Sequence, residues 1–84
     1  MATFVFGKMH PHDDTDLVGE VQAANARMEA RYQGCTARIV EADDDSSVAV
    51  DMRLTTDAES AACIDWYSAE LVRHRVIMLH DART

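Results

Sequence analysis

An apolar stripe over residues 14–33 requires this chain to set a helix against another surface. Leu17, Val21, Ala24, Met28 and Tyr32 recur at steps of three and four, which places them along one side of a helix that advances about 100° per residue. A helix with one apolar side is stable only when that side is buried. The remaining segments therefore have to supply a surface that covers the stripe.

The residues at both ends of this segment are typical of helix termini. Asp13, Asp14 and Asp16 precede the stripe, and negative charge is favourable at a helix N-terminus. We expect Asp13 or Asp14 to be the N-cap. Gly34 follows the stripe, where a left-handed C-cap residue is commonly found.

Four other segments have the composition and alternation of strands, and one more has that of a helix. The strands are predicted at residues 3–10, 35–42, 48–54 and 76–80. Val48, Val50, Met52 and Leu54 alternate with polar or small residues. Thr56 and Glu59 have the spacing of a capping box, which predicts a second helix over residues 57–74.

The predicted order is β-α-β-β-α-β, which is typical of the ferredoxin-like fold with a four-stranded antiparallel sheet and two helices on one face. Its length of 84 residues predicts a single α+β domain over residues 1–84. Right-handed crossovers predict that the first two strands run in one sense and the last two in the other.

The first and the last predicted strands are apolar on both sides, which suggests that the sheet face without helices is also covered. Phe4 and Phe6 alternate with Val5, and Val76 alternates with Ile77. A second copy of the chain is the simplest cover, because most soluble oligomers are homodimers. The alternative is that a short strand exposes a few apolar residues, which is common at protein surfaces.

Charge and composition restrict the classes of partner. The chain has 15 acidic and 8 basic residues, a net charge of −7 and 48% hydrophobic residues. The negative charge disfavours direct binding to nucleic acid and favours a basic protein partner. No apolar run is long enough to span a membrane and no signal sequence is present, so we expect a cytoplasmic protein. Cys35 and Cys63 are expected as free thiols, although they could pair.

Three histidines are predicted to gather at one end of the fold. His10, His12 and His74 share that end with aspartates, and imidazole and carboxylate groups are zinc ligands. His10 or His74 could also transfer protons. The structural alternative is that they end a strand, occupy a turn and complement a helix dipole. No cofactor motif is present, and we expect no cofactor.

Asp65 and Trp66 are candidates on the second helix. In one helix rotation Asp65 lies among alanines, where burial would raise its pKa and suit it to acid–base chemistry. In the favoured rotation Ile64, Tyr67 and Leu71 face the core and Asp65 lies at the margin. Trp66 is expected either to pack or to serve a binding surface.

The loop at Asp43, Asp44 and Asp45 is either an acidic recognition feature or a solvated turn. No phosphate-binding loop, Cys-x-x-Cys, His-Glu-x-x-His or nucleophile elbow occurs. We therefore expect a non-enzymatic interaction or regulatory module, acting through Phe4 and Phe6, through Trp66, or through the acidic loop.

Two alternatives stay open. The two-sided apolar strands are similar in general plan to the dimeric α+β barrel proteins, which implies a small-molecule enzyme or ligand-binding protein using His10, His74 or Asp65. The acidic surface also suits an inhibitor that occupies the nucleic-acid site of a basic protein.

Overall fold

Strands and helices alternate in the order expected from the sequence. The computed structural model describes residues 2–10, 12, 14–43, 46–54 and 57–80. The elements are β1 (Ala2–Lys8), α1 (Leu17–Arg31), β2 (Thr36–Asp43), β3 (Ser47–Arg53), α2 (Asp57–Arg73) and β4 (Val76–His80). The predicted α+β class is confirmed, and each predicted strand is found within two residues of its expected ends.

The four strands form one antiparallel sheet in the order β2-β3-β1-β4. β1 lies between β3 and β4 and is antiparallel to both, and β2 is antiparallel to β3. β1 and β2 therefore run in one sense and β3 and β4 in the other, as the crossover rule predicts.

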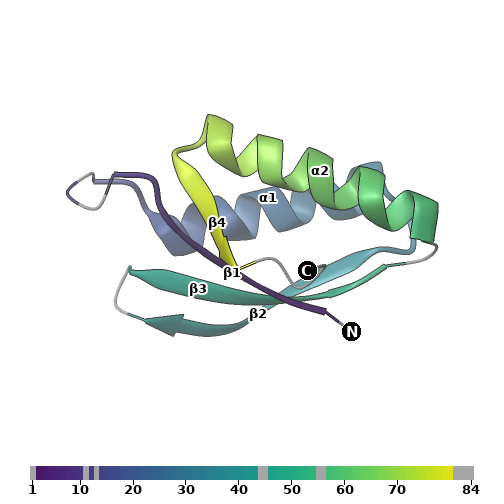
Figure 1. Ribbon diagram of the computed structural model, residues 1–84, viewed down its shortest axis with the longest axis horizontal. Helices are drawn as coiled ribbons and strands as arrows, with labels where there is room; N and C mark the ends of the chain where they lie inside the picture. The colour runs from purple at the N-terminus through teal and green to yellow at the C-terminus, as the bar shows by residue number, and fades with distance from the viewer. Residues whose placement is uncertain (1, 11, 13, 44–45, 55–56, 81–84) are drawn as a thin grey trace.

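Both helices lie on the same side of the sheet (Figure 1). Alternate strand residues point toward them, because successive side chains of a strand point to opposite faces. In β3 these are the buried residues Val48, Val50 and Met52. The α1 stripe packs on this face as predicted, with Leu17, Val21, Ala24 and Met28 fully buried.

Phe4 and Phe6 lie in the core rather than on the solvent side of the sheet. Both side chains are fully buried, and the ring of Phe6 meets that of Tyr67 edge to face with centroids 5.4 Å apart. The placement of these rings on an exposed interaction face was therefore wrong. The helix-covered face takes the larger side chains because they remove more apolar area from water.

The first helix begins at Leu17, three residues later than the expected segment 14–33. Asp16, and not Asp13 or Asp14, is the N-cap: its Oδ1 accepts a hydrogen bond from the Gly19 backbone N–H at 3.1 Å. Gly34 takes a left-handed conformation with φ of 90°, as expected. It lies two residues beyond the C-cap Tyr32.

The second helix adopts the favoured rotation. Cys63, Ile64, Tyr67 and Leu71 are buried, whereas Asp65 is exposed. The expected capping pair of Thr56 and Glu59 lies outside what the structure describes. Within the described residues, neither helix is long and apolar enough to cross a membrane.

Candidate interaction surface

The sheet has a second face that carries no helix, here called the open face. Its residues are those that alternate with the core residues of each strand and their cross-strand partners. They are Thr3, Val5 and Gly7 of β1; Thr36, Arg38, Glu41 and Asp43 of β2; Ser47, Ala49, Asp51 and Arg53 of β3; and Ile77, Leu79 and His80 of β4.

An apolar area lies across β1, β3 and β4 on this face. Val5 is paired with Ala49, and Ile77 is paired with Gly7. Leu79 is 55% exposed. Its side chain covers Gly7, since its Cδ1 lies 2.7 Å from the position that a Cβ on Gly7 would occupy. The apolar residues on one side of β1 and β4 thus lie in the core, and those on the other side lie on the open face.

A bulge in β2 sets which charges reach the open face. Ile39 is paired with Val50 and Glu41 with Ala49, so Val40 is the extra residue. Without this interruption Glu41 would point toward the helices. With it, Glu41 and Asp43 share the open face with Arg38. β2 is therefore basic near its start and acidic near its end.

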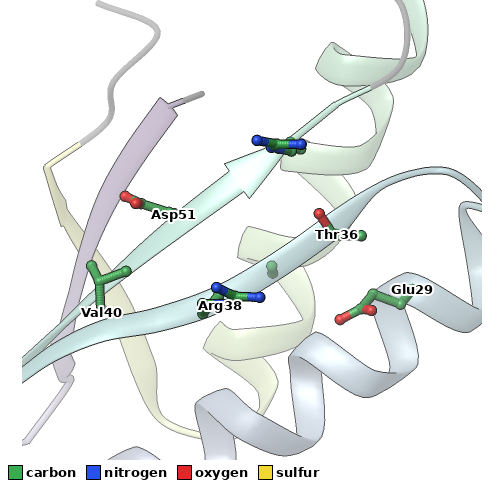
Figure 2. A pocket seen from close by; sticks show the side chains of 7 residues that line it. Glu29, Thr36, Arg38, Val40 and Asp51 are labelled. Carbon is green, nitrogen blue, oxygen red and sulfur yellow. The ribbon is translucent and has the colours of Figure 1, made fainter.

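A hollow of about 580 Å³ lies at the basic end of the open face. It is lined by Glu29, Thr36, Ala37, Arg38, Val40, Asp51 and Arg53. Figure 2 shows that Thr36, Arg38 and Val40 come from β2, Asp51 from β3, and Glu29 from α1 beyond the sheet edge. Val40 is 50% exposed and adds an apolar wall.

The charges around the hollow are held differently. Thr3 Oγ1 donates to Asp51 Oδ1 at 2.5 Å, which fixes this carboxylate on the open face. Register places Arg38 opposite Asp51 and Arg53 opposite Thr36. Neither guanidinium forms an ion pair with another of the described residues, so both can meet an incoming acidic group.

The other end of the molecule contains one of the predicted histidines. His74 Nδ1 lies 3.0 Å from Glu20 Oε2 of α1, and His74 Nε2 lies 3.7 Å from Glu70 Oε1. Arg75 follows in a left-handed conformation with φ of 66°, and its carbonyl accepts from the Met9 N–H at 2.9 Å. This turn brings β4 back beside β1.

Glu70 is the centre of a charge network between the helices. Arg27 Nε lies 3.2 Å from Glu70 Oε1, and Arg73 Nη1 lies 3.6 Å from Glu70 Oε2. The Arg27 pair is a charge contact rather than an aligned hydrogen bond, since its buried Nε and Nη2 have no hydrogen-bond partner within the described structure. His74 thus takes part in joining α1 to α2.

The structure does not join His10 and His12 to this network. Both are exposed. In the part of the chain that the structure describes, no group of three or more histidine, cysteine, aspartate or glutamate side chains is placed to hold a metal ion. Asp43 is exposed at the end of β2, while Asp44 and Asp45 lie outside the described residues.

Trp66 packs at the helix surface. Its ring lies edge to face with Tyr32 at 6.0 Å, and the Arg31 guanidinium lies 5.5 Å from its centroid. Asp65 beside it is exposed on α2, and α2 covers the sheet face opposite the open face. Neither residue is therefore brought into the hollow.

Two buried polar contacts could not be predicted from the periodicity of the sequence. The Tyr67 hydroxyl donates to Asn25 Oδ1 in the core, where burial, and then the nearby Cys63, raises the pKa of Tyr67 above its usual value. Burial, followed by the charge of Cys35 and a hydrogen bond between the two thiols, raises the pKa of Cys63 to about 12.

Arg38, Asp51 and Arg53 were not singled out from the sequence. The hairpin register would have aligned them, but the extra residue at Val40 is not visible as a break in the β2 pattern. A scan of protein-family models gives no match, and neither a search of curated proteins nor one of solved structures gives a significant match.

Proposed function

We propose that this protein is a small, non-enzymatic interaction module that associates with a second copy of itself through the open face. The observation that carries this proposal is the layout of that face. Apolar residues lie across β1, β3 and the edge strand β4, and charges of opposite sign occupy the two ends of β2.

The proposal includes assignment to the ferredoxin-like fold. The strand order β2-β3-β1-β4 supports it, since β3 separates the parallel pair β1 and β2, and β1 separates the parallel pair β3 and β4. Each β-α-β unit is then split by one strand, as this arrangement requires. Helices on one face leave the other face available for association.

The apolar area across β1, β3 and β4 supplies the attraction. Val5, Ala49, Ile77 and Leu79 form an apolar area, and removing such area from water is worth about 25 cal/mol per Å² before the costs of association. An exposed apolar area framed by polar residues is typical of a protein contact surface.

The charges favour a second copy over an unrelated partner. A two-fold axis that crosses the strands near Val40 would lay β2 on the β2 of its partner in the reverse direction. Arg38 on one side of the axis would then face Glu41 of the second copy, and Arg53 would approach Asp43 of the second copy. Each copy would contribute both charges, as an isologous contact requires.

The available area sets the expected strength. A four-stranded face with strands of about seven residues spans roughly 19 Å by 23 Å. A standard interface buries about 800 Å² per partner, or about 16% of this chain's 5070 Å². The flat area of the open face, roughly 440 Å², is smaller than that class, so we expect a weak association with a dissociation constant in the micromolar range.

Analytical ultracentrifugation over a concentration series tests the proposal. The wild type is expected to shift from monomer to dimer, and Leu79→Asp should keep it monomeric by placing a charge in the apolar area. Val72→Asp is the matched control, because Val72 is 48% exposed but lies on α2. Its dimerisation should be unchanged.

A charge exchange tests the two-fold arrangement. Arg38→Glu should weaken the dimer at least about tenfold through like-charge contact, and adding Glu41→Arg should restore it. A wild type that stays monomeric at about 100 µM, well above the expected constant, would overturn the proposal. Equal loss with Val72→Asp would move the contact to the helices.

A further inference from the structure

Cys35 and Cys63 come from distant parts of the chain and meet in the core. Cys35 precedes β2 and is 2% exposed, while Cys63 is on α2 and is fully buried. Both are free thiols. A hydrogen bond joins the two side chains, so their sulfur atoms are already neighbours.

A second contact holds the same two segments together. Tyr32 precedes Cys35 by three residues, and its carbonyl accepts from the Cys35 N–H at 3.1 Å. The Tyr32 ring packs on Trp66, with centroids 6.0 Å apart, and Trp66 lies almost one turn beyond Cys63 on α2. The position of the turn at residues 32–35 relative to α2 is therefore fixed by contacts other than the thiols.

We propose that Cys35 and Cys63 form an oxidative modification site, at which a peroxide converts the paired thiols into an intramolecular disulfide without unfolding of the chain. Sulfur atoms in hydrogen-bond contact have to approach by only about 2 Å to reach bonding distance. The bond would tie the start of β2 to α2 and close the loop of residues 36–62.

The reaction balances with a peroxide as the two-electron oxidant. One sulfur attacks a peroxide oxygen, which breaks the O–O bond and gives a sulfenic acid and water. The other sulfur then displaces the hydroxyl group, which leaves as water with the remaining thiol proton. In total two thiols and one hydrogen peroxide give one disulfide and two waters.

The order of the two steps follows from the positions of the thiols. Cys63 is fully buried and its raised pKa makes it a poor first nucleophile. Cys35 lies next to the turn at residues 32–34 and is 2% exposed. We therefore expect Cys35 to react with peroxide and Cys63 to complete the bond.

Peroxide treatment followed by thiol labelling tests the site. The folded wild type is incubated with excess hydrogen peroxide, unfolded with iodoacetamide and weighed by mass spectrometry. We expect a product that lacks two hydrogens, takes up no label and runs as a monomer on a non-reducing gel. Its thermal midpoint should rise by roughly 10 °C and return after dithiothreitol.

Two controls make the result decisive. Cys63→Ala should give no intramolecular bond, and the wild type oxidised in guanidinium shows that the oxidant is active. The proposal is overturned if the folded chain keeps two labelled thiols while the unfolded chain reacts, or if it gains oxygen atoms or crosslinks between copies instead. Neither thiol is on the open face, so this outcome is independent of dimerisation.

Discussion

The hydrogen bond from Tyr67 to Asn25 places a polar pair inside an otherwise apolar core. Asn25 is only 7% exposed, and Tyr67 is fully buried against Phe6. A buried polar group is tolerated when its partner is present and becomes costly when that partner is removed. The pair therefore fixes how α1 and α2 face each other at this level.

We expect Tyr67→Phe to lower the free energy of unfolding by about 1 to 2 kcal/mol, because Asn25 Oδ1 would lose its donor. Urea denaturation gives this value directly. Tyr32→Phe is the control, since the Tyr32 hydroxyl has no hydrogen bond within the described structure, and should change stability by less than about 0.5 kcal/mol. Equal effects would show that the Asn25 contact contributes nothing.

Alkaline pH should destabilise the fold through the same buried groups. Burial raises the pKa of Cys63 from 9.0 to about 12 and that of Tyr67 above its usual 10.0. Above pH 9 the unfolded chain therefore binds fewer protons than the folded chain, and the free energy of unfolding falls as pH rises. Below that pH these two groups contribute a constant term.

Urea titrations between about pH 7 and pH 11 measure this slope. Cys63→Ala should remove the part that begins near pH 9, and Tyr67→Phe the part that begins near pH 10. Stability that stays level across the alkaline range in the wild type would contradict the assigned cause.

At this scale the sequence predicted the buried stripe of α1 but not the polar pair. Leu17 and Met28 follow helical spacing, which burial alone explains. Asn25 lies beside that stripe, and its burial depends on a hydroxyl 42 residues away. Phe4 and Phe6 were misplaced because alternation separates two faces of a strand without saying which one the helices cover.

A single side chain can determine the residue at which a helix begins, and α1 is an example. The Asp16 carboxylate receives the Gly19 N–H, and Gly19 leaves space for it, because a Cβ there would overlap the carboxylate. This combination begins α1 at Leu17 although acidic residues precede it from Asp13 onward.

Asp16→Ala is expected to destabilise the chain by about 1 kcal/mol through loss of the N-cap. Asp14→Ala is the matched control, because it removes the same charge from an exposed position outside the helix. Thermal unfolding followed by circular dichroism compares them. A similar loss in both variants would assign the effect to charge near the helix dipole.

Element types were predictable where periodicity was long, whereas most element boundaries were predicted only approximately. The strand at Val76–His80 agrees at both ends, since Arg75 turns sharply before it. The start of α1 differs from the start of the expected segment because several aspartates compete for the N-cap position. Only three-dimensional geometry selects one of them.

At the scale of the molecule, chain sense was predictable because crossover handedness restricts it. The register of β2 on β3 was not, since the extra residue Val40 interrupts the ladder without interrupting the pattern of side chains. The candidate surface depends on that register. This is why its charged residues could not be grouped from the sequence.

Deletion of Val40 should restore an unbroken ladder while keeping Glu41 on the open face. β2 is one of the two outer strands of the sheet, and a regular outer strand offers its unpaired backbone groups to other chains. We expect the deletion variant to aggregate faster than the wild type in a light-scattering assay at equal concentration. Slower aggregation would show that the bulge does not protect this edge.

The bulge at Val40 therefore bears on where assembly stops. A chain that joined copies edge to edge could add them without end, in the manner of a fibril. β2 is one of the two edges of the sheet, so its interruption hinders edge-to-edge addition on that side, and in the proposed dimer the two open faces would cover each other. In the proposed assembly, the irregular residue would thus favour a pair over a filament.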